Sequence, residues 1–269
     1  MAADPQSHGS PRQRTVPGQD AERQLVGRLE LLEDEVAERM RELKADRAET
    51  LQRLALAAEY RDDAGSQHTQ RVAATAAATA AKLGLGPAEV ELLREAAPLH
   101  DLGNLAIPDT ILLKPGKLSA QEYELIKTHA ELGARLLSGS SSPVLQMAAV
   151  IAMSHHERWD GRGYPEGLAG EAIPLVARVV AVADVYDTLT HDRPYKSLWP
   201  VEQAIAELCR AAGSQFDPRV VDAFLEMHED AAYDHEMDGP PQRGLWTRAP
   251  LRLRGGGAPA PAPRAAPSA

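Results

Sequence analysis

Apolar residues recur at eleven-residue intervals along residues 21–58, a stretch without proline in which charged residues alternate with leucine. Such a repeat corresponds to about 3.67 residues per turn and is typical of helices that pair nearly straight or with a slight right-handed supercoil. We therefore expect a long coiled-coil-like signalling helix that pairs two chains in parallel as a homodimer. The alternative is an amphipathic helix folded onto its own domain. The repeat comprises Leu25 and Val36, then Leu29, Met40 and Leu51, and finally Leu32, Leu43 and Leu54.

Residues 59–238 have the apolar spacing of successive helices. Ser119 followed by Glu122 forms a capping box that opens one helix, and Asp217 with the following proline supplies the N-cap and first turn of the last one. The pattern therefore predicts an all-α domain over 59–238. The other helices are expected over residues 66–83, 88–101, 143–157 and 175–190, with a glycine-rich loop at 157–174.

The two ends of the chain have a different composition. Residues 1–20 are rich in Pro, Gly, Ser and Gln, and residues 239–269 are rich in Pro, Ala, Gly and Arg. We expect both ends to be disordered. The second holds five arginines and no acid, so weak electrostatic contact with an acidic surface is an alternative role for it.

Composition narrows the class of protein. With 43% hydrophobic but only 4% aromatic residues, the core must consist of Ala, Leu, Val and Ile, which favours helix. The net charge of −10 argues against nucleic acid as a partner. Cys209 is the only cysteine, which excludes an intrachain disulfide and suits a reducing compartment. No apolar run has the length of a membrane span. We expect a soluble, cytoplasmic protein.

Seven side chains that can bind metal lie in apolar helical contexts: two aspartates, Asp101 and Asp184, and five of the nine histidines. Isolated buried charges are costly, so this many groups are hard to bury without a shared partner. Adjacent residues on a helix point about 100° apart, so neighbouring ligands can flank one site. Imidazole mixed with carboxylate suits iron or manganese. The pattern favours a metal site over separate ion pairs. The histidines are His68, His100, His129, His155 and His156.

Seven sequence motifs follow one another between residues 68 and 218. They are "HTQRV" at 68–72, "LHDLG" at 99–103, "IPD" at 107–109, "LLKPGKL" at 112–118, "HHERWDGRGYPEGL" at 155–168, "AVADVYDTLTHDRPYK" at 181–196 and "FDP" at 216–218. In order and spacing these motifs resemble the HD-GYP family, helical metal-dependent phosphodiesterases that hydrolyse cyclic di-GMP. The resemblance implies an HD-type helical bundle domain, closed by the loop that contains Gly163-Tyr164-Pro165.

The resemblance also implies a binuclear metal centre with two divalent transition-metal ions, iron or manganese. Asp101 would bridge the two ions, which together can activate water and neutralise charge on a phosphate. One ion would be held by His68, His100, Asp101 and Asp184, and the other by Asp101, His129, His155 and His156.

The substrate would be a cyclic dinucleotide, cleaved to linear pGpG or GMP. The resemblance implies that Arg193 and Lys196 hold its phosphates, although a salt bridge from Arg193 to Asp187 or Asp192 is the alternative. Tyr164 would stack on a guanine or fix the loop. A diguanylate cyclase or another signalling protein is the implied partner.

Two positions depart from the family pattern. Some relatives carry a glutamate that recruits a third metal four residues before the first histidine, where this chain has Ala64, so two metals are expected. The family lysine after the His-Asp pair is Asn104 here, which we expect to act in catalysis less effectively. The two metals would remain the larger electrostatic term, and Lys114 or Lys117 could reach the site instead. The competing hypotheses are a metal-bound module that binds cyclic di-GMP or a protein without efficient turnover, and a hydrolase for another nucleotide.

Overall fold

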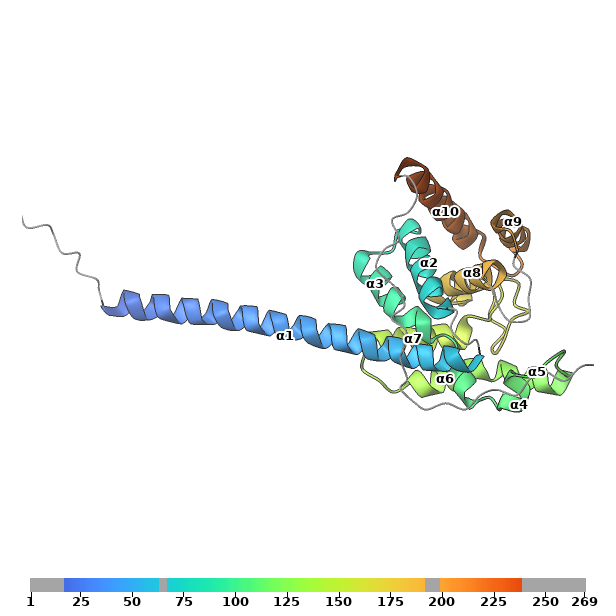
Figure 1. Cartoon of the computed structure of the whole chain (residues 1–269), viewed down its shortest axis with the longest axis horizontal. Coiled ribbons are helices and arrows are strands. Elements are labelled where there is room, and N and C mark those ends of the chain that lie inside the picture. The colour runs from blue at the N-terminus through green and yellow to red at the C-terminus, as the bar shows by residue number, and fades with distance from the viewer. Residues whose placement is uncertain (1–16, 63–66, 192–198, 239–269) are drawn as a thin grey trace, which may run out of the picture. The chain divides into compact units, whose positions relative to one another are not determined.

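The computed structural model describes residues 17–62, 67–191 and 199–238, and every regular element in these ranges is a helix (Figure 1). The all-α fold expected from the sequence is confirmed. The α-helices are α1 (Pro17–Asp62), α2 (His68–Lys82), α3 (Pro87–Ala96), α4 (Asp109–Leu112), α5 (Ala120–Lys127), α6 (His129–Leu137), α7 (Pro143–Ser154), α8 (Leu175–Thr190), α9 (Val201–Ala211) and α10 (Pro218–Asp238); the 3-10 helices are η1 (Ala97–Leu99), η2 (Leu102–Ala106) and η3 (Gly170–Ala172).

Helix α1 is the long helix that the eleven-residue repeat predicts, and it continues past residue 58 to Asp62. Most of the repeat is exposed, with Leu25 at 65% and Leu43 at 63% of their side chains accessible. The C-terminal turns differ, because Ala55 and Ala58 are buried in the core. The apolar stripe of α1 is therefore exposed to solvent in a single chain, whereas the C-terminal end of the helix packs into the core of the domain.

The core lies where α2 packs against α3 and α8, and where α6 packs on α7. One face of α2 is built from alanines, of which Ala76, Ala77 and Ala80 are fully buried, so the neighbouring helices can approach closely. Larger residues such as Leu93 and Phe224 fill the remaining space. This core belongs to the first of two units, which ends at His228 within α10.

Some helices end earlier than the pattern predicts. The prediction of a helix over 88–101 is wrong at the C-terminal end, because α3 ends at Ala96 and the 3-10 helices η1 and η2 follow. The helix opened by Ser119 has the predicted capping box, with the Ser119 Oγ accepting from the Glu122 N–H at 3.2 Å. It ends at Lys127, and a separate helix begins at His129. These breaks matter because the site residues lie at them.

Several expectations fall on residues outside the described ranges. They are Ala64, Arg193 and Lys196, the N-terminal segment up to residue 16, and the tail 239–269. Among the described residues, no helix combines the length and the apolar character that crossing a membrane requires.

Candidate metal centre

Helix ends bring the seven candidate ligands together. Six of the seven lie at helix ends. His68 and His129 are the first residues of α2 and α6, His100 and Asp101 lie between η1 and η2, and His155 and His156 follow α7. Only Asp184 lies inside a helix, α8. The ligand atoms form two groups, each with its members within 4.8 Å of one another: one comprises Asp101, His129, His155 and His156, and the other comprises His68, His100 and Asp184.

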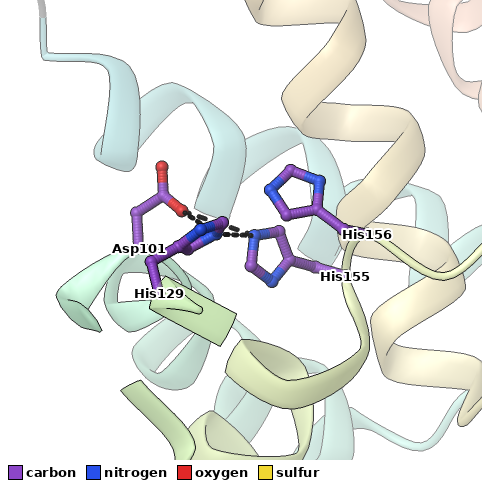
Figure 2. A group of neighbouring side chains, drawn as sticks. All are labelled: Asp101, His129, His155 and His156. Atoms are coloured by element: carbon purple, nitrogen blue, oxygen red, sulfur yellow. Dashed lines mark hydrogen bonds and ion pairs between the residues drawn. The ribbon is translucent and has the colours of Figure 1, made fainter. Parts of the chain in front are cut away.

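The first group is arranged around one carboxylate oxygen (Figure 2). Asp101 Oδ1 lies 3.3 Å from His129 Nε2 and 3.3 Å from His155 Nε2, and these two nitrogens are 3.5 Å apart. The His156 ring stands beside that of His155, with the ring centroids 4.0 Å apart. Three imidazoles and a carboxylate therefore surround one small space.

The second group adjoins the first through His100. His68 Nε2 lies 3.3 Å from Asp184 Oδ1, and the His68 and His100 rings are 5.7 Å apart. His100 Nε2 in turn lies 3.6 Å from Asp101 Oδ2. The two oxygens of Asp101 thus face different ligand groups.

In three of the histidines, the ring nitrogen Nδ1, which points away from the cluster, lies beside a backbone carbonyl oxygen. His100 Nδ1 lies 2.9 Å from the Ala97 oxygen, His129 Nδ1 lies 2.7 Å from the Ile126 oxygen, and His155 Nδ1 has the same kind of contact. A carbonyl only accepts, so Nδ1–H is the donor and the lone pair stays on Nε2. Each Nε2 therefore points into the cluster with a lone pair that could bind a metal ion.

Asp187 orients His68 in the corresponding way, and the sequence analysis missed this role. Its Oδ2 lies 2.6 Å from His68 Nδ1, and Arg71 donates to both of its oxygens at 2.5 and 2.9 Å. Burial raises the pKa of Asp187, but the bonds from His68 and Arg71 outweigh it and leave the pKa lowered. The available signal was spacing, because Asp184 and Asp187 are three residues apart on one helix, and so are His68 and Arg71.

The donor set fits a metal ion. Among the described residues, the buried His100 Nε2 and Asp101 Oδ1 have no hydrogen-bond partner. Buried polar atoms without a partner are rare in folded proteins and indicate an ion or water that completes them. Imidazole and carboxylate ligands together suit iron, manganese and similar cations. The chain can therefore hold metal in this cluster.

The ionisation states also suit metal binding. Burial raises the pKa of Asp101, but His100, His129 and His155 outweigh this effect and hold it well below its usual range. Asp184 behaves in the same way, chiefly through His68. Burial lowers the pKa of His100 and that of His156. Ionised carboxylates and neutral imidazoles are the forms that bind metal.

Gly103 allows the Asp101 turn to lie directly on α6. A Cβ at this position would overlap the carbonyl oxygen of His129 and the backbone nitrogen of Gly133. Only glycine permits this approach, and the approach brings Asp101 next to His129.

The glycine-rich loop closes one side of a 360 Å³ cavity, which reaches His155, His156 and Asp184. Tyr164 lines the cavity, with its ring centroid 4.8 Å from that of His156 and tilted by 31°. Glu157 shapes the loop, because its buried carboxylate accepts from three backbone N–H groups, those of residues 166, 167 and 168, at 2.7 to 3.1 Å. A cavity of this size is within the range of small-molecule sites in proteins.

Asn104 is buried in η2, one turn after Asp101. The lysines proposed as substitutes for the family residue differ in what surrounds them. Lys114 is bound to Glu122, with Nζ–O distances of 2.7 and 2.8 Å, and Lys117 is exposed. Lys114 is thus already paired with an acid on α5.

Comparison with known proteins shows the family. The sequence model of a protein family, described as "HD domain", matches residues 52–220 of this chain. Cyclic di-GMP phosphodiesterase response regulator RpfG of Xanthomonas campestris is 51% identical over 194 residues, which are 72% of this chain and 51% of the regulator. A cyclic di-GMP phosphodiesterase of Thermotoga maritima is 43% identical, over 80% of this chain and 59% of its own length. The chain belongs to the HD domain family, as the sequence motifs predict.

The chain is also similar to two proteins of Vibrio cholerae. 3'3'-cGAMP-specific phosphodiesterase 2 of Vibrio cholerae is 43% identical over 70% of this chain and 36% of the enzyme. The crystal structure of a cyclic GMP-AMP specific phosphodiesterase of V. cholerae has the same fold, with a TM-score of 0.51 and 23% identity over 71% of this chain and 51% of that chain. The chain spans about half the length of the first two curated relatives it matches.

Proposed function

We propose that this chain is a metal-dependent phosphodiesterase that hydrolyses cyclic di-GMP to linear pGpG, GMP or both. The observation that carries the proposal is the convergence of inward-facing imidazole nitrogens on the two oxygens of Asp101. Relatives named as cyclic di-GMP phosphodiesterases support the substrate.

In this proposal the two ligand groups would hold one divalent cation each, iron or manganese, and Asp101 would contribute an oxygen to each. Two such cations would activate water and neutralise charge on the phosphate oxygens. The chain's own residues keep the ligands in the form that binds. Asp187 fixes the tautomer of His68, and backbone carbonyls fix those of His100, His129 and His155.

The substrate would enter through the cavity beside the loop. Tyr164 is placed to stack on a guanine because its ring lines the cavity, and burial raises the pKa of its hydroxyl, so it stays a neutral phenol. Arg193 and Lys196 are assigned to the substrate phosphates on the family resemblance alone. Asn104 would offer an amide donor where the family has a charged one.

A second candidate function rests on Asn104. Without the lysine charge, the domain would bind metal and cyclic di-GMP and signal through α1 with little turnover. Relatives specific for 3'3'-cGAMP support a third candidate, in which the same site cleaves another cyclic dinucleotide.

The deciding experiment measures metal content and turnover on protein purified without oxygen. We expect about two metal ions per chain, loss of both in Asp101→Ala, and loss of mainly one in His129→Ala. Turnover is then measured with cyclic di-GMP, 3'3'-cGAMP and cyclic di-AMP, with and without a chelator. Tight binding of cyclic di-GMP without hydrolysis would support the signalling module, and cleavage of another dinucleotide in preference would support the third candidate. Three tightly bound metals per chain would contradict the two-metal centre.

The wider organisation belongs to the same proposal. It keeps the signalling and dimerisation helix and the catalytic domain that the sequence places at 21–58 and 59–238. The helix itself runs from Pro17 to Asp62, so residues 17–20 belong to it and not to the N-terminal segment expected over 1–20. A homodimer through α1, a diguanylate cyclase or similar signalling partner, and a cytoplasmic location complete it. The exposed apolar stripe on α1 supports the dimer.

A further inference from the structure

Glu59, near the end of α1, caps the helix that begins with His68. Its carboxylate is buried, with Oε1 accepting from the His68 N–H at 2.7 Å. Oε2 accepts from the Thr69 N–H at 3.3 Å and from the Thr69 hydroxyl at 2.6 Å. Helix α2 has no side-chain cap of its own, since Gln67 at the N-cap position adopts φ 57° and makes no capping bond. The first N–H groups of a helix need an acceptor, and a negative charge there is favourable. Glu59 supplies both from a different helix.

Arg61, two residues further along α1, holds the turn that follows Asp101. Its Nη1 donates to the carbonyl oxygens of Asn104 at 2.8 Å and Leu105 at 2.6 Å, and its Nη2 donates to that of Ile107. The guanidinium also contacts the Asp109 carboxylate at 2.7 and 2.9 Å. Three carbonyl oxygens at the end of η2 thus accept from one planar guanidinium group, whose fork of N–H donors a lysine ammonium cannot reproduce.

These two contacts reach different halves of the metal centre. His68 belongs to one ligand group and Asp101 to the other. The side chains of Glu59 and Arg61 do not belong to either group, so any effect on metal passes through the backbone that they hold. Both contacts start from the same turn of α1, the helix that also carries the exposed apolar repeat.

We infer that Glu59 and Arg61 are positioning residues, which fix the separation of the His68 and Asp101 segments for metal binding. The inference rests on the proposed function, because it requires the cluster to bind metal. It makes the end of α1 part of the support of the centre. A shift of α1 would alter both ligand groups through these two side chains.

The test compares variants that keep the size of each side chain. Glu59→Gln removes the charge and one acceptor, and Arg61→Lys keeps the charge but removes the fork. Two control variants break exposed ion pairs nearby. Asp109→Asn removes the exposed partner of Arg61 but leaves the three carbonyl bonds, and Glu49→Gln breaks the surface pair with Arg53 on α1.

Metal affinity is measured with Mn²⁺ by competition against a chelator, together with the thermal midpoint of the metal-free protein and amide exchange at His68 and Thr69. Loss of outer support for metal ligands typically weakens binding about 10- to 100-fold. We expect losses of that size for Glu59→Gln and Arg61→Lys, faster exchange at the two amides in Glu59→Gln, and the parent affinity in both controls. All affinities are measured well below the midpoint, so that a lower stability does not imitate weaker binding.

Unchanged Mn²⁺ affinity in both variants, with only a lower midpoint, would overturn the inference and leave the proposed function intact. If the unmodified protein binds no metal, the proposed function fails, and this inference fails with it. Should Glu59→Gln not fold, Glu59→Asp, which keeps the charge but withdraws it by one methylene, replaces it under the same criteria.

Discussion

At the scale of single residues, we expect Asn104 to limit how well the proposed centre turns over substrate. A lysine at this position would bring a positive charge and a proton donor to a phosphate that becomes more negative in the transition state. An asparagine keeps only a donor. Loss of one such electrostatic group typically costs about 10²- to 10³-fold in rate, or about 2.7–4 kcal/mol. Lys114 is bound to Glu122 in this structure.

We therefore predict that Asn104→Lys raises kcat by up to about 10²- to 10³-fold, whereas KM for cyclic di-GMP changes less. Steady-state kinetics of both proteins, fully loaded with metal, provide the measurement. Asn104→Gln is the control, because it keeps the amide and adds length without charge. Equal turnover of all three proteins would show that position 104 does not contribute to the chemistry.

Buried histidines give the metal-free protein a defined pH dependence. Burial lowers the pKa of His100 and of His156 below the ordinary value of 6.5. Below pH 6.5 the unfolded chain takes up protons on these residues and the folded chain does not, so protonation favours unfolding. The depressed carboxylate pKa values act only near and below pH 3.8 and so lie outside this window.

We predict that the thermal midpoint of the metal-free protein is steady above about pH 6.5 and falls as the pH decreases to 5.5. A series of thermal melts in one ionic strength measures this. His156→Gln removes one of the two groups and should make the decline shallower. A midpoint that stays level over the whole range would contradict neutral burial of these histidines.

At the scale of elements, the contact between η2 and α6 sets the position of Asp101 beside His129. Gly103→Ala would place a methyl group into the backbone of α6. Overpacking of this kind costs about 1–3 kcal/mol, occasionally more. We predict a lower thermal midpoint and weaker metal binding, because the two ligands move apart. Gly86→Ala is the matched control, since its Cβ would meet only Glu89 at 3.7 Å. A Gly103→Ala protein with the parent metal affinity would show that the contact serves packing alone.

The sequence predicts elements here better than it predicts their ends. Local signals such as the Ser119–Glu122 capping box and the repeat in α1 identify helices correctly. The pattern does not show the break before His129, because apolar spacing continues through it. It also did not single out α9, although its apolar positions have helical spacing.

The candidate ligands were identifiable from residue type and motif, whereas their supports were not. Glu59 and Asp187 both form a hydrogen bond with His68, although they are nine and 119 residues away from it along the sequence. Such contacts depend on how α1, α2 and α8 pack, and spacing along one helix does not encode this packing. The same holds for Gly103, whose requirement arises from a backbone 26 or more residues further along.

At the scale of the whole molecule, the exposed stripe on α1 is the feature that a single chain leaves unexplained. Leu32 is 49% and Leu43 is 63% exposed, and they lie eleven residues apart on one face. An eleven-residue repeat favours nearly straight pairing of two helices. Pairing would cover this stripe and bring two catalytic domains side by side.

We predict that the unmodified protein is a dimer at micromolar concentration and that Leu32→Glu with Leu43→Glu gives monomers, because like charges would be buried in the seam. Sedimentation velocity measures both. The control adds the same two charges at Gly27 and Ala45, which lie on about the opposite face of the helix by its 3.6-residue period. If the control also dissociates, added negative charge and not the stripe governs assembly. If the unmodified protein is already monomeric, the helix does not pair, and the interpretation of its repeat as a dimer seam is wrong.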